Sequence, residues 1–470
     1  MNFLPVVLWS DVLVWLLVAG ALALAWGIAR NPPLRSAWAR VGQSGVGMGA
    51  AVLLVVFVLV GLLDSLHYRE RLPGDPGAAP VYGVEVLSAL DGALSALREN
   101  NEKTYSAPLA TRSFAMEMET FQGPEGQHLE RRQFPRLRFG GAHLGSREGD
   151  RGADIGKRLA LAGGLALLLW LGSLAGVLGR FPGHAWGVRW QRLWHPEPED
   201  FAWRGVLVAW GGILVVVLPL FCLVPAYHVF GTDKVGQDVL YQVLKSIRTA
   251  LVIGLVTTLV TLPLAVLLGT MAGYFRGWVD DLIQYLYTTL NSIPGVLLIA
   301  AAVLMMQGVL DRHPQWFDTA AERADMRLLA LCFILGLTSW TGLARLLRGE
   351  TLKLARLEYI QAAQAFGVSS LRILLRHILP NLFHLVLISL VMDFSSLVQA
   401  EAVLSYVGIG VDPSMISFGT MINNARMELA REPMVWWSLV AAFFFMFALV
   451  LAANLFADVV RDAFDPRRRA

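Results

Sequence analysis

Long apolar runs alternate with short polar segments along this chain of 470 residues. An α-helix needs about 20 mostly apolar residues to cross the hydrocarbon core of a bilayer. Lipid offers the backbone no hydrogen-bond partners, so each run of that length is predicted to be helical. The pattern therefore predicts an all-α, polytopic membrane protein with about nine transmembrane helices. These are residues 11–29, 47–65, 158–178, 204–225, 249–272, 283–307, 328–344, 381–402 and 435–457.

Composition agrees with this interpretation. Hydrophobic residues make up 56% of the chain and charged residues only 16%, whereas soluble domains are about a quarter charged. The net charge of +3 gives no indication of nucleic-acid binding. Cys222 and Cys332 both lie inside apolar runs, so neither a disulfide framework nor a metal site is indicated.

Lys and Arg in the short loops predict the orientation, because cytoplasmic loops carry an excess of these residues. Most of them fall in alternate segments if the N-terminus lies outside and the C-terminus in the cytoplasm. Two loops depart from this bias, since 273–282 has only Arg276 and 308–327 has three arginines. The total still predicts a multi-pass plasma (inner) membrane protein whose cytoplasmic segments are 30–46, 179–203, 273–282, 345–380 and 458–470.

Four parts follow from this topology. Residues 1–65 form an N-terminal extension with two transmembrane helices, and 66–157 form a small extracytoplasmic (periplasmic) domain. Residues 158–203 add a third extra helix and a cytoplasmic linker, and 204–470 remain as a core. Apolar residues at helical spacing predict that the outer domain is partly helical, and the Gly-rich stretch 140–156 predicts a flexible exit from it. The helical positions are Val84, Leu87, Leu90, Leu94 and Leu97.

The segment 356–381 is too long and too structured for a plain cytoplasmic loop. Residues 357–366 are rich in good helix formers. Gly367 predicts a helix stop, because it tolerates a left-handed backbone. Ser370 is a candidate cap for a second helix, and Pro380 marks a bend where that helix enters the membrane. Ala362 and Ala363 leave a smooth surface that another protein can approach closely.

This segment resembles the EAA loop of ATP-binding-cassette importer permeases. The resemblance rests on Gln361-Ala362-Ala363, then Gly367, then Leu379-Pro380. It implies that the first short helix is a coupling helix that docks in a groove of an ATPase subunit. One departure is that Gln361 stands where the family usually has Glu, so an acidic contact with the ATPase is lost or softened. Glu358 lies on a neighbouring part of the helix surface and is a candidate for that role.

Further motifs resemble the oligopeptide and dipeptide branch of these permeases, over about 204–470. The ordered motifs are Phe230-Gly231-Thr232-Asp233, residues 273–280, residues 400–410 and residues 454–467. This resemblance implies a six-helix type I importer core that moves peptides by alternating access. The first 200 residues depart from the pattern, because the branch usually places one helix before the Gly-Thr-Asp segment.

No phosphate-binding Gly-rich loop occurs in the sequence, so this chain is not expected to bind ATP itself and needs no cofactor of its own. The resemblance implies that ATP and Mg²⁺ are bound by two separate ABC ATPase subunits. It also implies a second homologous permease subunit and a periplasmic or extracellular solute-binding protein. No arrangement typical of an enzyme active site is present, so a transport subunit rather than an enzyme is predicted.

Two acidic residues fall within the eighth apolar run. Asp393 lies near its middle, and Glu401 follows about two helical turns later on broadly the same side. Ionisable groups in a membrane normally face a cavity or a partner. One hypothesis is that this face lines the translocation path. The alternative is a hydrogen-bonded contact with a neighbouring helix or with the partner permease, and Glu401 favours it more strongly than Asp393.

Two other functions stay open at this stage. A non-transporting membrane sensor that uses residues 66–157 would account for Gln361 and for the added domain. An importer of a non-peptide solute, such as a nickel chelate, would share every motif described above. Pro263 and Pro294 lie inside predicted spans, where each indicates either a hinge for alternating access or a static kink.

Overall fold

The fold is described from a computed structural model. It covers residues 3–72, 81–122, 128–145, 148–180, 186–195, 197 and 200–464. Nine helices of the described residues are long and apolar enough to cross a membrane, which confirms the polytopic helical fold. They are Trp9–Arg30, Gly45–Asp64, Arg151–Leu178, Trp203–Leu223, Val239–Phe275, Gly295–Arg312, Ala320–Leu354, Ser370–Tyr406 and Trp437–Phe464.

One predicted span, 283–307, is wrong as a single helix. α10 (Gly277–Ser292) ends before Pro294, and α11 (Gly295–Arg312) begins after it. Ile293 between them has an extended backbone, with φ −96° and ψ 132°. The proline ring clashes with a helical residue before it, so Pro294 forces this break. Pro263, by contrast, lies within the continuous helix α9 (Val239–Phe275).

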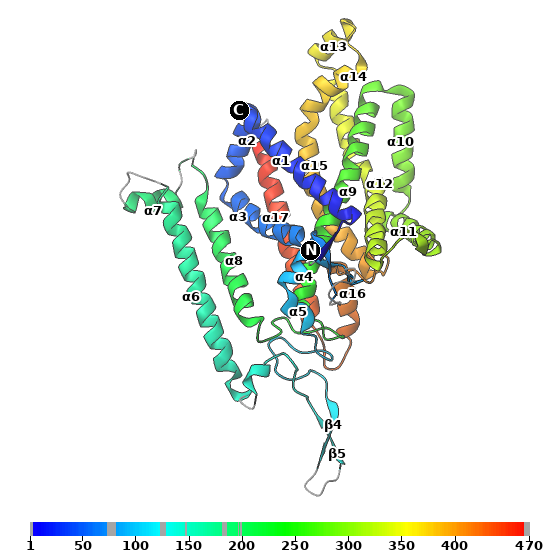
Figure 1. Ribbon diagram of the computed structural model, residues 1–470. Coiled ribbons are helices and arrows are strands. Elements are labelled where there is room, and N and C mark those ends of the chain that lie inside the picture. Colours follow the sequence, from blue (N-terminus) through cyan, green and yellow to red (C-terminus); the bar gives the residue numbers. More distant parts are fainter. Residues whose placement is uncertain are drawn as a thin grey trace. The chain divides into compact units, whose positions relative to one another are not determined.

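The chain divides into two compact units (Figure 1). Unit 1 comprises residues 1–6, 42–249 and 416–452, and unit 2 comprises residues 7–41, 250–415 and 453–470. Two long helices each contribute residues to both units, namely α9 and α17 (Trp437–Phe464). The four-part division at residues 65, 157 and 203 stays a prediction.

Unit 1 holds the extra helices, the outer segment and the first turns of α9 and α17. α6 (Arg151–Leu178) and α3 (Gly45–Asp64) both pack against α8 (Trp203–Leu223). The Trp170 indole Nε1–H donates to the Leu207 carbonyl over 3.0 Å, which ties α6 to α8. The shorter helices of this unit are α4 (Ala89–Ala93), α5 (Ser95–Glu99), α7 (Trp186–Trp194), α16 (Phe418–Glu428) and the 3₁₀ turns Ala142–Leu144 and Glu148–Asp150.

Two small sheets complete unit 1. β1 (Phe3–Val6), β2 (His67–Glu70) and β3 (Leu87–Ser88) form an antiparallel sheet in that order, with Phe3 opposite Glu70 and Tyr68 opposite Leu87. β4 (Glu117–Gln122) and β5 (His128–Gln133) form a hairpin. The predicted outer helix begins only at Ala89, because Leu87 pairs in β3. Residues 151–156, predicted as part of a flexible exit, form the first turns of α6.

Unit 2 contains α1 (Trp9–Arg30), α2 (Pro32–Gln43), α10, α11, α12 (Ala320–Leu354), α13 (Glu358–Ala365), α14 (Ser370–Ile373) and α15 (Leu379–Tyr406), with 3₁₀ turn Pro314–Trp316 and π-helical turn Leu374–Ile378. Its main apolar cluster joins α9, α10 and α12 to the segment that follows α12. α2 packs on the end of α17 through Ala37, Val41 and Phe464. α1 is held at one end by Ser10, whose backbone N–H and hydroxyl donate to the Asp325 carboxylate.

Candidate functional site

The predicted coupling helix exists as α13, at the tip of unit 2 beyond α12 and α15 (Figure 1). It carries Glu358, Gln361, Ala362 and Ala363. Two backbone hydrogen bonds close its end, from Val368 N–H to the Ala363 carbonyl and from Gly367 N–H to the Gln364 carbonyl. This Schellman motif requires a left-handed residue, and Gly367 has φ +73°. The predicted helix stop is therefore present at Gly367.

Three isoleucines fix this tip to unit 2. Ile360 of α13, Ile373 of α14 and Ile378 are each fully buried in the main cluster. Full burial of such a side chain stabilises the fold by roughly 1.5–3 kcal/mol relative to exposure. The tip is therefore a rigid part of unit 2 and not a loose loop.

The opposite surface of the tip is exposed and partly apolar. Glu358, Gln361 and Ala362 are exposed, while Ala363 is half-buried. Phe366 is 87% exposed, more than any other large apolar side chain described. Further exposed apolar residues near it are Leu357, Tyr359, Leu371 and Leu375. Exposed apolar surface of this kind is typical of places that contact another protein or the membrane.

The base of the tip is tied to a second predicted motif, residues 273–280. Asp280 accepts two hydrogen bonds from the Arg348 guanidinium, from Nε over 2.6 Å and from Nη2 over 2.7 Å. Such a two-point pair fixes direction as well as distance. Farther out, the Gln364 amide donates to the Tyr274 hydroxyl over 3.2 Å. Two motifs about 80 residues apart thus form one structural unit.

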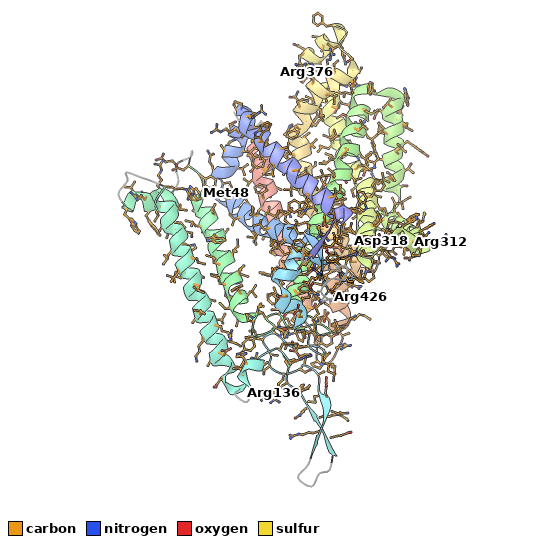
Figure 2. The ribbon with its side chains drawn as sticks, in the orientation of Figure 1. Met48, Arg136, Arg312, Asp318, Arg376 and Arg426 are labelled. Carbon is orange, nitrogen blue, oxygen red and sulfur yellow. The ribbon has the colours of Figure 1, made fainter. Side chains whose placement is uncertain are left out.

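Leu379 and Pro380 begin α15, and the chain before them departs from α-helical geometry. Residues Leu374–Ile378 form a π-helical turn, closed by a hydrogen bond from Leu379 N–H to the Leu374 carbonyl. Proline has no N–H, and its ring displaces the carbonyl four residues earlier, so Pro380 accounts for the wider turn. The side chain of Arg376 lies on this turn (Figure 2). Ser370 is not the cap, because Ser369 occupies that position without a side-chain hydrogen bond.

Comparison with known proteins places this segment in a family. The family described as "Binding-protein-dependent transport system inner membrane component" matches residues 265–470, which include the whole tip. A glutathione transport system permease protein, GsiD of Pectobacterium atrosepticum, is 32% identical over 52% of this chain and 74% of its own length. The chain belongs to this permease family.

Other relatives of the permease carry related names. The oligopeptide transport system permease protein OppC of Mycobacterium tuberculosis is 30% identical over 52% of this chain and 77% of its own length. The dipeptide transport system permease protein DppC of Bacillus subtilis is 28% identical over 52% and 70%. A solved chain titled "Inward facing conformations of the MetNI methionine ABC transporter" has 14% identity and a TM-score of 0.37, covering 48% of this chain and 97% of that one. That score is too low to support a statement about the fold.

The two predicted membrane acids of the permease differ in their surroundings. Glu401 is 2% exposed and accepts a hydrogen bond from the Ser405 hydroxyl over 2.6 Å. Asp393 is half-buried, and within the described part of the chain no side chain or backbone N–H pairs with its carboxylate. Both lie on α15. Their roles in the translocation path stay predictions.

A second motif of the permease, the turn Gly231–Asp238, is covered by the outer segment of unit 1. Thr232 is fully buried, and its hydroxyl accepts from Ser106 N–H over 2.7 Å and donates to the Thr104 carbonyl over 2.9 Å. Its own carbonyl accepts from the Trp437 indole over 2.9 Å. Glu102 N–H donates to the Gly236 carbonyl. The turn is therefore packed against the outer segment.

His228 joins the core to the outer segment. Its ring is buried between two carboxylates, with Nδ1 2.8 Å from Asp238 Oδ2 and Nε2 3.3 Å from Glu102 Oε1. Burial opposes its protonation, but the hydrogen bonds to Asp238 and Glu102 outweigh this and raise the pKa of His228 to about 9.

Glu102 also caps a turn of the outer segment, accepting from the backbone N–H groups of Arg138, Phe139 and Gly140. Burial alone would raise its pKa. The hydrogen bonds from His228 and these three amides instead lower the pKa of Glu102 to about 2. No spacing in the sequence relates Glu102 to His228, so this pair was not predicted.

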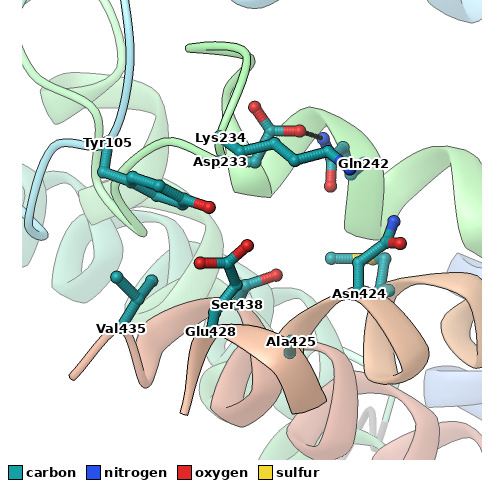
Figure 3. A pocket seen from close by; sticks show the side chains of 10 residues that line it. Tyr105, Asp233, Lys234, Gln242, Asn424, Ala425, Glu428, Val435 and Ser438 are labelled. Atoms are coloured by element: carbon teal, nitrogen blue, oxygen red, sulfur yellow. Dashed lines mark hydrogen bonds between the residues drawn. The ribbon is translucent and has the colours of Figure 1, made fainter. Parts of the chain in front are cut away.

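A small polar pocket lies beside the covered turn, also within unit 1 (Figure 3). The hydroxyl of Tyr105 and the carboxylate of Glu428 face each other across it. Burial and the neighbouring Glu428 raise the pKa of Tyr105 above its usual value. Asp233 accepts from the Gln242 amide over 2.7 Å on the opposite wall. The pocket is thus part of the joint between outer segment, α9 and α16.

Proposed function

We propose that this permease is a subunit of an ATP-driven importer that moves peptides or peptide-like solutes across the inner membrane. The observation that carries the proposal is the tip at 356–381, whose short helix α13 is packed firmly into unit 2 and presents an exposed, partly apolar face. Support for peptides comes from the names of the relatives, two of which are oligopeptide and dipeptide permeases. Glutathione, named for a third relative, is itself a peptide-like solute.

Energy comes from separate ATPase subunits. In this proposal each ATPase receives one coupling helix of type α13 in a groove, with Phe366, Ala362 and Gln361 at the contact. Because Ile360, Ile373 and Ile378 lock the tip into unit 2, movement of the docked ATPases passes directly to α12 and α15. A second permease subunit and an outer solute-binding protein complete the assembly. The N-terminus lies outside and the C-terminus in the cytoplasm.

Asp393 is proposed to face the translocation path or the second permease subunit. An ionisable group within a membrane helix needs a partner or water, and the described part of this chain supplies no partner for it. Replacement of Asp393 by Asn keeps the size of the side chain and removes its charge. Unchanged uptake of every peptide tested with the Asp393→Asn protein would remove this residue from the path.

The main test is reconstitution of the full-length permease with a cognate ABC ATPase pair, second permease subunit and binding protein in liposomes. We expect ATP-dependent uptake of labelled di- and oligopeptides. Ala362→Arg places a large charged group on the exposed face of α13 and is expected to abolish both ATPase capture and uptake. Ala115→Arg, at another exposed alanine, in the outer segment, is the matched control.

Two results would contradict the proposal. The first is a permease that captures no ATPase even after Gln361→Glu restores the usual family residue. The second is capture that survives Ala362→Arg unchanged. Capture without peptide uptake, together with uptake of another solute, would retain the transport function and replace the substrate.

A further inference from the structure

The short helix α7, between α6 and α8, carries an aromatic stripe that no transport function explains. Trp186, Trp190 and Trp194 are spaced four residues apart, so they share one face of the helix. The rings of Trp186 and Trp190 are stacked with centroids 5.8 Å apart, and those of Trp190 and Trp194 are 6.0 Å apart. The stripe therefore forms a continuous surface along the whole helix.

The position of α7 is fixed by the two flanking membrane helices. Leu193 is 3% exposed and packs with Leu174, Val177 and Leu178 at the end of α6 and with Leu207 at the start of α8. α6 is a candidate membrane span that ends at Leu178, and α8 is a candidate span that begins at Trp203. A helix packed against both of these ends lies at the height where hydrocarbon gives way to headgroups.

The tryptophan stripe is open. Trp186 is 68% exposed, Trp190 37% and Trp194 38%. Indole rings are enriched at this height of a bilayer, because their apolar body enters the lipid while their N–H remains hydrated. Arginines also flank the helix, since the Arg180 guanidinium stacks on Trp203 at 4.6 Å and Arg204 donates to the Trp194 carbonyl over 3.2 Å.

We propose that α7 is an interfacial helix that lies along the membrane surface with its Trp186–Trp190–Trp194 stripe in the lipid headgroup region. It would anchor the cytoplasmic turn of the α6–α8 pair. Arg192 is already paired with Asp200 over 2.7 Å and with Glu197 over 3.1 Å. The charge of Arg192 is thus compensated within the chain, and the exposed stripe itself is uncharged, so the indoles are the groups that would hold the helix at the membrane.

The test uses the full-length permease in vesicles of phosphatidylcholine brominated at shallow or deep acyl positions. Bromine quenches tryptophan fluorescence on contact. The emission contributed by α7 is obtained by subtracting that of a protein with Trp186, Trp190 and Trp194 all replaced by Phe. We expect lipid brominated at shallow positions to reduce this contribution about twofold or more. Lipid brominated at deep positions should quench it less strongly. Trp340→Phe is the control, because Trp340 is 4% exposed inside unit 2 and its contribution should resist both lipids.

Three outcomes would overturn the proposal. Quenching of the α7 contribution by aqueous acrylamide but not by bromine would place the stripe in water. Resistance to both quenchers would place a protein partner over it. Quenching that needs anionic lipid would replace indole insertion by electrostatic attraction.

A second measurement does not depend on the triple substitution. Full-length proteins with Trp190→Cys or Val188→Cys, in a background without Cys222 and Cys332, are labelled with an environment-sensitive fluorophore. Val188 is also exposed but lies on the opposite side of the helix from Trp190. We expect blue-shifted emission at position 190 and not at 188. Equal emission at the two positions would contradict the proposal.

Discussion

Two glycine-marked turns of this permease have the same backbone conformation and opposite surroundings. Gly367, at the end of α13, has φ +73°, and a Cβ added there would meet nothing within 4 Å. Gly236, in the outer turn, has φ +78°, and a Cβ added there would lie 1.8 Å from the Glu102 carbonyl oxygen. The turn at Gly367 is open to solvent, and the turn at Gly236 is covered by the outer segment of the same chain.

The same kind of turn, a glycine with positive φ, therefore has two different uses in this chain. At the tip, Gly367 ends a helix whose exposed surface is proposed to dock an ATPase, so substitutions there should alter assembly before they alter folding. At the outer turn, the partner is residues 102–106 of the same chain, so substitutions should alter folding first. The outer segment is therefore an integral part of unit 1.

The largest effect is expected from Glu102→Ala. This change leaves three backbone N–H groups, of which that of Gly140 is buried, and the His228 Nε2 without their acceptor. Removal of one member of a buried charge pair costs about 3–5 kcal/mol. We expect the unfolding midpoint of the purified protein to fall sharply, or the protein to fail to accumulate. Glu358→Ala, at the exposed tip, should change stability by about 0.5 kcal/mol or less. Equal stability of the two variants would remove the distinction between the turns.

Gly236→Ala should follow, at about 3 kcal/mol, from strain at positive φ and collision with Glu102. Gly367→Ala carries the same backbone strain without the collision, and should cost about 1–2 kcal/mol. Thermal unfolding of both variants in detergent measures the difference. A cost at Gly367 that matches the cost at Gly236 would mean that strain alone, and not the covering segment, determines the effect.

Phe366→Ala tests the open side of the comparison. The side chain is 87% exposed, so its removal should leave the unfolding midpoint unchanged. A central aromatic contact in an interface is worth about 2 kcal/mol, which corresponds to about a 30-fold weaker complex. Binding of the ATPase pair to the reconstituted permease measures this loss. Unfolding at lower temperature with unchanged ATPase binding would reverse our assignment of this surface.

The stabilisation provided by the His228 pair in the covered turn is expected to depend on pH. The pKa of His228 is raised to about 9 from its ordinary 6.5, so its protonated ring stabilises the fold fully below pH 6.5. That stabilisation is lost as the pH rises toward 9. We expect the unfolding midpoint to fall between pH 6.5 and 9, and His228→Gln to flatten this dependence. A profile that is the same in both proteins would show that the His228 pair does not contribute.

The tip was predictable from sequence because its determinants are local. Helix-forming residues, a glycine and a proline within 356–381 fix the helix, its stop and the start of α15. Where the structure differs there, the reason is also local, as with Ser369 in place of Ser370. The family resemblance came from the same short segment, and the comparisons confirm it.

The covered turn was not predictable, because its partners are far apart in sequence. Glu102 and His228 are 126 residues apart, and both residue types are common at surfaces. Nothing in a single sequence indicates that they meet. The break at Pro294 was visible as a proline, but hydropathy averages over it, so one apolar span was predicted where two helices stand.

The smallest effect is expected from Gln361→Glu. In this chain the Gln361 amide Nε2 donates to the Arg356 carbonyl over 3.2 Å, a hydrogen bond that an ionised carboxylate cannot make. Glutamate at this exposed position would release that carbonyl and present a negative charge to the ATPase. Because both groups remain solvated, stability should change by about 0.5 kcal/mol or less.

ATPase affinity should rise about two- to fivefold at low salt, and the gain should fade as salt is added. Gln364→Glu is the matched control, since Gln364 lies on the same helix but donates its amide to the Tyr274 hydroxyl. A gain that persists at high salt, or that Gln364→Glu reproduces, would show that the charge at position 361 is not what the usual family residue supplies.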